Sequence, residues 1–180
     1  MKLLRTIRLD PSDTFVFDKA AEPGEWAVPG AFAFWDRDPT KLEGKARSAF
    51  RSGFLGLASF GRSTLVQIVE ADETDRAAVV EMLAQHLVDH YRAPDMNAAR
   101  SAAEEEVTFA QSLCTPGQDT LIAVHRTYED GAVREQFRSL RPREGPKPAR
   151  AFSFMEVEGE DEEQPREQVD LISLADKERK

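Results

Sequence analysis

Two stretches of the chain repeat apolar residues with the period of an α-helix. The first is predicted from about Arg76 to Tyr91, and Pro94 ends it. Its apolar stripe, at three-and-four spacing, consists of Val79, Val80, Leu83, Leu87 and Tyr91. The second helix is predicted from about Asn97 to Leu113, with Asp95 as its capping residue. The chain therefore carries a pair of consecutive helices.

Before this helix pair, short segments alternate apolar and polar residues with the period of a β-strand. Strands are predicted at 2–9, 14–17, 54–60 and 63–70. The last two are expected to form a hairpin about a tight turn at Gly61 and Arg62. A helix interrupted by Gly44 is predicted at 39–50, whereas Pro29 and Gly30 argue against an unbroken strand that continues through 31–35.

After the helix pair, the segments 120–128 and 132–140 flank the turn residues Asp130 and Gly131. Asp-Gly is favoured in two-residue hairpin turns, so a hairpin is predicted here. Its register pairs are Tyr128 with Val133, Val124 with Phe137, and Arg126 with Glu135. One face of the hairpin is thus apolar with a cross-strand ion pair. A last strand is predicted at 152–157.

Strands that cluster before and after two consecutive helices indicate an α+β fold. We expect a mostly antiparallel sheet with the helix pair packed on one face. Residues 1–157 are predicted to form a single α+β domain, a length sufficient to bury a core. Residues 158–180 are predicted to form an acidic C-terminal tail with a short apolar docking segment.

Charge is distributed unevenly along the 180 residues, whose net charge is −9. The last thirty residues hold 4 Lys and Arg against 10 Asp and Glu, so they contribute −6 of this total. Nucleic-acid binding is disfavoured, because it depends on neutralising phosphates. The basic residues between Arg134 and Arg150 are interpreted as a solvated face or a dock for the acidic tail, with anion binding as a third possibility.

Composition also indicates the cellular compartment in which the protein is expected. No apolar run is long enough to span a bilayer, so no membrane association is expected. The single cysteine, Cys114, excludes an internal disulfide and fits a reducing cytoplasm. It is predicted to be a buried small hydrophobic residue at the end of a helix.

His86 and His90 are four residues apart on the first predicted helix, which places both imidazoles on the same side. Two metal ligands on a helix have this spacing, and His125 is the candidate third ligand if its strand face packs on the helix. Ordinary packed or edge histidines are the alternative interpretation. A small metal-binding or metal-dependent enzyme that uses these three histidines with a divalent transition metal is therefore kept as an alternative hypothesis, and no other cofactor is expected.

No motif combines a nucleophile with a base, and the glycines at 53, 56 and 61 match no phosphate-binding pattern, so no catalytic residue is predicted. Trp26 and Trp35 flank turns, and tryptophan is enriched at interface hot spots. In the tail, an apolar segment follows the acidic run and contains Val169, Leu171, Ile172 and Leu174. These residues are predicted to bind a protein partner, the domain itself or a second copy of the chain.

A family resemblance is carried by three runs of the sequence, RTIRLDPSDTFVF, EWAVPGAFAFWD and FRSGFLGLASFGRSTLVQI. Over about residues 1–140, the chain resembles an uncharacterised family of bacterial hypothetical proteins. The resemblance implies no activity and no functional residues, because that family has no established function. The favoured hypothesis is a cytoplasmic accessory or protein-interaction domain without catalytic activity of its own, a class that includes assembly factors.

Overall fold

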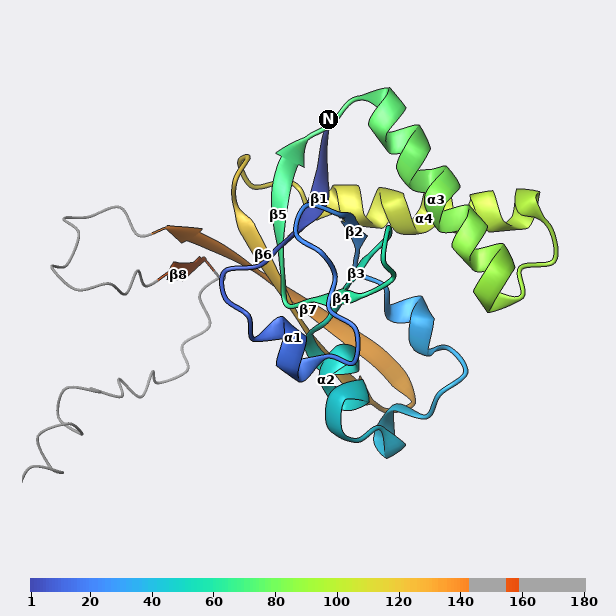
Figure 1. The fold of residues 1–180 in the computed structure, drawn as a ribbon, viewed down its shortest axis with the longest axis horizontal. Helices are drawn as coiled ribbons and strands as arrows, with labels where there is room; N and C mark the ends of the chain where they lie inside the picture. Colours follow the sequence, from blue (N-terminus) through green and yellow to red (C-terminus); the bar gives the residue numbers. More distant parts are fainter. Residues whose placement is uncertain (143–154, 159–180) are drawn as a thin grey trace, which may run out of the picture.

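The computed structural model describes residues 1–142 and 155–158. Within them, eight strands form one sheet in the order β4-β3-β2-β1-β5-β6-β7-β8, and every neighbouring pair is antiparallel (Figure 1). The strands are β1 (Lys2–Ile7), β2 (Trp26–Val28), β3 (Phe54–Gly56), β4 (Arg62–Ser63), β5 (Leu65–Glu70), β6 (Leu121–Glu129), β7 (Ala132–Pro142) and β8 (Met155–Glu158). The prediction of a mostly antiparallel sheet is confirmed.

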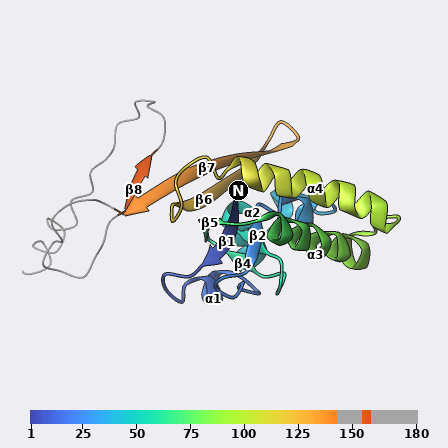
Figure 2. The same ribbon diagram turned by 90° about the horizontal axis from the view of Figure 1, so that it is seen from above.

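The helices are α1 (Asp13–Val16), α2 (Gly44–Ser52), α3 (Glu73–Tyr91) and α4 (Met96–Ser112), with 3₁₀ turns η1 (Ala31–Phe34) and η2 (Pro39–Lys41). The consecutive helices α3 and α4 pack on one another: they cross in Figure 1 and lie next to one another in Figure 2. Helix α4 also packs on β1 and β2. The α+β fold class with a packed helix pair is therefore confirmed. No helix in the described ranges is long and apolar enough to cross a membrane.

Capping residues set the ends of the helix pair. The Asp72 carboxylate accepts the Asp75 N–H at 2.8 Å, and the Asp75 carboxylate accepts the Asp72 N–H at 3.1 Å. This capping box starts α3 at Glu73, three residues before the predicted start at Arg76. The predicted cap of α4 is confirmed, since the Asp95 carboxylate accepts the Ala98 N–H at 2.8 Å.

The predicted hairpin of β6 and β7 is confirmed together with its register. Tyr128 pairs with Val133 and Arg126 pairs with Glu135. Its turn residues Asp130 and Gly131 have φ values of 52° and 76°, as a two-residue turn between twisted strands requires. The hairpin is long, and its tip, residues 128–133, is exposed.

The predicted strand at 14–17 is wrong, because residues 14–16 lie in the helix α1, which ends before Phe17. Asp13 anchors the helix: its carboxylate accepts the Thr64 N–H at 3.1 Å and the Thr64 hydroxyl at 2.5 Å. Phe17 is buried, whereas Phe15 is 71% exposed. The β-forming residue types of this segment are overruled by this tertiary contact.

The hairpin predicted at 54–70 is also wrong in its pairing. β3 pairs with the two-residue β4, whereas β5 lies between β1 and β6. All six residues of β5 pair with β1, a longer ladder than the three residues of β3 could offer. Ser63 marks the change of partner, because its hydroxyl donates to Leu65 O at 2.7 Å and Ile7 O at 3.2 Å.

Two further predictions are revised. The helix predicted at 39–50 is η2 followed by α2, which starts at Gly44 instead of being interrupted there. Of the strand predicted at 152–157, β8 contains 155–157 and continues to Glu158, while 152–154 lie outside the described residues. The tail segment 159–180, including Val169, Leu171, Ile172 and Leu174, also lies outside them.

The sheet curls, so that strands far apart in its order face one another. The rings of Phe54 in β3 and Phe137 in β7 have centroids 6.2 Å apart. The guanidinium of Arg126 in β6 reaches the Gly53 carbonyl beside β3 at 2.9 Å. The main apolar core lies inside this curl and beneath the helix pair.

Candidate functional site

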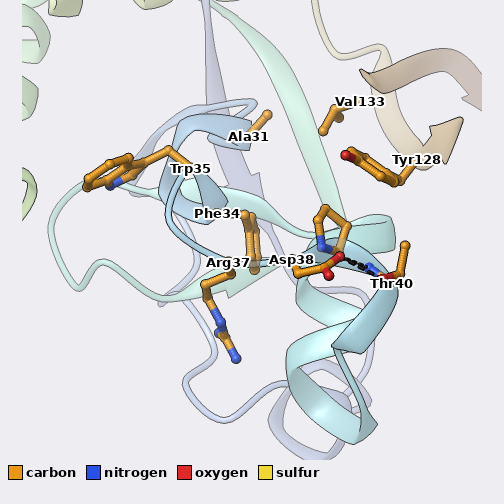
Figure 3. A pocket seen from close by; sticks show the side chains of 9 residues that line it. Ala31, Phe34, Trp35, Arg37, Asp38, Thr40, Tyr128 and Val133 are labelled. Carbon is orange, nitrogen blue, oxygen red and sulfur yellow. Dashed lines mark hydrogen bonds between the residues drawn. The ribbon is translucent and has the colours of Figure 1, made fainter. Parts of the chain in front are cut away.

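A hollow of about 480 Å³ lies between the segment that contains η1 and η2 and the tip of the β6–β7 hairpin (Figure 3). It is lined by Ala31, Phe34, Trp35, Arg37, Asp38, Pro39, Thr40, Tyr128 and Val133. We call it the Trp35 hollow. In Figure 3, Trp35 and Tyr128 lie on opposite sides of it, with Phe34 between them.

Large apolar side chains are exposed around this hollow. Trp35 is 62% exposed, Tyr128 40% and Val133 42%. Phe34 is buried between them and packs edge-on against Phe50 of α2, with ring centroids 5.4 Å apart. The arrangement combines an anchored aromatic floor with an exposed apolar rim, which is typical of protein-contact surfaces.

The backbone conformation around Trp35 is fixed by one residue before it and by a helix cap after it. Gly30 has φ of 74°, and a Cβ there would lie 2.5 Å from Leu55 Cβ, so the entry to η1 requires glycine. After Trp35, the Asp38 carboxylate accepts the Thr40 N–H at 3.0 Å and the Thr40 hydroxyl at 2.6 Å, which caps η2. Both features keep Trp35 on the outer side of its turn.

Two buried arginines support the hollow from beneath. Arg62 places its guanidinium 4.8 Å from the centroid of the Phe34 ring and donates to Gly30 O at 3.3 Å and Gly53 O at 3.2 Å. Burial, with a smaller contribution from the nearby charge of Arg126, lowers the pKa of Arg62 to about 9. The floor of the hollow therefore rests on a buried cation.

Arg126 is fully buried and joins two segments of backbone, one at Pro29 and one at the end of α2. It donates to Phe50 O at 3.0 Å, to Gly53 O at 2.9 Å and to Pro29 O. Its remaining partner is Glu135, the register partner on β7, whose carboxylate accepts Nε–H at 2.9 Å. Burial lowers the pKa of Arg126, and the Glu135 carboxylate opposes that shift.

A smaller hollow of about 340 Å³ lies between η1, α3 and α4. Its lining is mainly apolar and includes Phe32, Leu87 and Phe109. Glu106 also lines it and accepts the Gly30 N–H at 2.8 Å. Burial raises the pKa of Glu106, so this carboxylate holds the η1 turn at the cost of its own solvation.

The histidines proposed as metal ligands are only partly brought together. His86 and His90 lie on the same side of α3 with ring centroids 5.8 Å apart. His86 Nε2 lies 2.9 Å from Leu57 O, and its ring stacks on Phe60 at 4.2 Å. His125 is exposed and is the neighbour of the buried Arg126 on β6. Because successive side chains of a strand alternate between faces, His125 lies on the face of the sheet opposite to that of Arg126. In residues 1–142 and 155–158, no group of three or more His, Cys, Asp or Glu side chains lies close enough to hold a metal ion. The metal hypothesis stays a prediction.

The other candidate residues differ in exposure. Trp26 is half-buried, and the Arg5 guanidinium lies 3.7 Å from its ring centroid. Trp35 is the more available of the two tryptophans for a partner. Cys114 is buried, as predicted, and burial raises the pKa of its thiol to about 11.

Tyr128 and Val133 were not identified as candidate contact residues from sequence, because both lie on the apolar face of the predicted hairpin. They are exposed because the hairpin tip extends past the buried part of the sheet. The length of the predicted strands is the sequence signal that could have indicated this exposure, because β6 has nine residues whereas β1 and β5 have six each. Phe15 was missed for a different reason, namely the wrong secondary structure predicted for 14–17.

Comparison with known proteins identifies a family whose function is unknown. The model of DUF6505, described as a family of unknown function, matches residues 1–154. The resemblance predicted for about residues 1–140 is thereby confirmed as a resemblance to an uncharacterised family. No curated protein and no solved structure matches the chain.

Proposed function

This chain belongs to DUF6505, a family of unknown function, and we propose that it acts as a protein-interaction domain that binds its partner through the Trp35 hollow. The observation that carries the proposal is the exposure of Trp35, Tyr128 and Val133 around one depression on the surface. A partner that inserts an apolar side chain over buried Phe34 would remove these three side chains from water.

The fixed backbone beneath the Trp35 hollow supports its assignment as a binding surface. The side chains around the hollow come from two segments far apart in sequence, and Arg126 connects the backbone beneath both of them. A preformed surface loses little conformational entropy when it binds, so its exposed aromatic groups contribute more to affinity. In this proposal the protein is an accessory factor, and its partner supplies whatever chemistry the complex carries out.

The test is affinity capture from cells that express the chain natively, followed by measured binding of each captured protein. The informative variant is Trp35→Ala/Tyr128→Ala, which removes both sides of the hollow and leaves Phe34 in place. The matched control is Phe15→Ala, because Phe15 is an aromatic residue on α1 that is more exposed than either Trp35 or Tyr128. A partner of the hollow should be lost with the double variant and retained with the control.

Three outcomes contradict the proposal. Recovery of the chain alone at every salt concentration leaves it without a partner. Equal binding by wild type and the double variant shows that the hollow is not the contact surface. Loss of binding with Phe15→Ala instead would assign the contact to α1.

A further inference from the structure

The smaller hollow between η1, α3 and α4 differs in chemistry from the Trp35 hollow. Its wall is apolar and consists of Phe32, Leu83, Leu87, Ala102 and Phe109. Its volume of about 340 Å³ lies at the lower end of the range of small-molecule sites, about 300–1,000 Å³. It shares no lining residue with the Trp35 hollow, so the two are separate sites. We call it the Glu106 hollow, after an acid that also lines it.

Only one of the two carboxylate oxygens of Glu106 is bonded within the fold. Oε1 accepts the Gly30 N–H at 2.8 Å. Within residues 1–142 and 155–158, no donor is bonded to Oε2, and Arg8 Nε is the one side-chain polar atom that is both fully buried and without a partner. Oε2 is therefore reached by solvent. Because Glu106 lines the hollow, this oxygen is available to a ligand bound there.

The fold does not fully compensate the negative charge of Glu106. Burial raises the pKa of Glu106 and the Gly30 N–H lowers it, while the charges of Glu135 and Arg126 act in opposite directions. The net shift of the Glu106 pKa is upward, so the ionised carboxylate is less stable here than in water. A ligand cation in contact with Oε2 would stabilise the ionised form, because an opposite charge at short range favours the charged state of a carboxyl group.

A second acid lies at the same hollow. Glu105 lines it, is exposed, and takes part in no ion pair among the described residues. Two other acids of the helix pair are already neutralised, since Glu104 lies 2.6 Å from Arg76 and Glu81 lies 2.5 Å from Arg100. The lining of the hollow therefore contains two carboxylates and no basic residue, and charge complementarity favours a cation.

We propose that the Glu106 hollow binds a small organic cation, namely a primary ammonium group on a compact apolar body. The ammonium group donates to Oε2 of Glu106, with Glu105 as the second carboxylate, and the apolar body packs against Phe32, Leu87 and Phe109. A carboxylate ligand would meet like charges, and a neutral ligand would form no charge-assisted hydrogen bond, so both bind more weakly. This inference concerns a different surface from the proposed function and does not rest on it.

The test is a titration of the isotope-labelled full chain with phenethylamine, followed by amide NMR spectra. The Gly30 amide reports on the site, because its N–H donates to the Glu106 carboxylate. Phenethylamine should shift the Gly30 resonance in a saturable way. Phenethyl alcohol has the same apolar body without the charge, and methylamine has the charge without the body, so each should bind at least about tenfold more weakly.

Three variants assign the binding to the carboxylate and to the hollow. Glu106→Gln keeps an oxygen that accepts the Gly30 N–H but removes the charge, so phenethylamine should bind at least about tenfold more weakly while phenethyl alcohol binds as before. Glu104→Gln makes the same charge change on the same helix outside the lining, and it should bind phenethylamine as wild type does. Ala102→Phe fills the hollow from an exposed position of α4 and should abolish binding of both molecules.

Several results overturn the inference. Absence of a saturable Gly30 shift up to about 10 mM phenethylamine would mean that the hollow binds no such cation. Equal affinities for phenethylamine and phenethyl alcohol, or undiminished amine binding by Glu106→Gln, would show that the carboxylate does not recognise the charge. Undiminished binding by Ala102→Phe would place the amine outside the hollow. The ligand series on wild type decides the matter even if a variant does not fold.

The titration uses the chain without a protein partner, so its outcome is separate from that of the capture experiment. If phenethylamine binds as expected while no partner is captured through the Trp35 hollow, the amine site stands and the proposed function fails. If a partner is captured through the Trp35 hollow while no amine binds, the proposed function stands and the amine site fails.

Discussion

Replacing Arg126 by methionine tests whether the curled sheet depends on one buried cation. The guanidinium is 0% exposed and connects the backbone at Pro29, Phe50 and Gly53 to the carboxylate of Glu135. Methionine preserves most of the side-chain length and the apolar stem but donates no hydrogen bond. The substitution therefore removes the four interactions with little change in the volume of the core.

The expected loss of stability follows from the groups left behind. A buried carbonyl without a donor costs about 1–3 kcal/mol, and removing one member of a buried ion pair costs about 3–5 kcal/mol. These costs are not additive, because the three carbonyls share one site and can relax together. We expect Arg126→Met to lower the free energy of unfolding by about 3–5 kcal/mol, a large share of the roughly 5–15 kcal/mol typical of a domain.

The assay is equilibrium unfolding in urea, monitored by tryptophan fluorescence and circular dichroism. The matched control is Arg100→Met, which removes an exposed arginine whose Nε lies 2.5 Å from the Glu81 carboxylate. A solvated ion pair of this kind contributes little, so the control should unfold close to wild type. A double variant, Arg126→Met/Glu135→Met, also removes the uncompensated carboxylate and should be more stable than the sum of its single variants indicates.

An Arg126→Met variant that is no less stable than Arg100→Met would refute the dependence of the curled sheet on Arg126. That result would mean that water or a rearranged side chain satisfies the three carbonyls at no cost. An additive double variant would show, separately, that Arg126 and Glu135 are not coupled.

The remaining predictions concern titratable groups elsewhere in the fold. Burial opposes ionisation of Glu25, but hydrogen bonds from Ser59, Glu22 and Ala58 prevail and lower the pKa of Glu25. The ionised carboxylate therefore stabilises the fold fully above the unfolded pKa of 4.5, and this stabilisation is lost as pH falls through the folded pKa. The difference in unfolding free energy between wild type and Glu25→Gln should therefore shrink on acidification, and a difference independent of pH would contradict this. The Cys114 thiol, with its pKa raised to about 11, should react with iodoacetamide at pH 8 far more slowly in the native chain than in urea; equal rates would show that it is accessible. If His86 and His90 hold a transition metal, elemental analysis of protein purified without a histidine tag should detect it in wild type and not in His86→Ala/His90→Ala; less than about a tenth of an equivalent in wild type refutes the hypothesis.

Local features of this chain could be predicted because neighbouring residues alone determine them. The Asp130-Gly131 turn and the alternation on either side specify the β6–β7 hairpin to the exact register pair. Asp95 caps α4 as predicted, since a cap acts on backbone groups of the next turn. The order of strands and helices along the chain was enough to identify the α+β class.

The candidate site could be predicted only in part. Trp35 was named from its residue type and its place beside a turn, and it is exposed. Tyr128 and Val133 join it across the hollow because the sheet curls, and no local pattern measures that curl. Arg126 was expected in a cross-strand ion pair with Glu135, but its three carbonyl partners lie more than seventy positions away in sequence.

The amino-acid sequence by itself determined the Asp130-Gly131 turn with its hairpin register and the Asp95 cap, because each depends on contacts between residues close in the chain. It also determined the class of fold through the order of strands and helices. Only the tertiary structure decided that residues 14–16 are helical and that β5 pairs with β1. It also decided that Trp35 is exposed next to Phe34, whose ring lies against the buried Arg62. Those outcomes depend on contacts with residues distant in sequence. A strand pairs with the partner that offers the longer ladder of hydrogen bonds, and a segment adopts the conformation whose polar groups find partners in the packed chain.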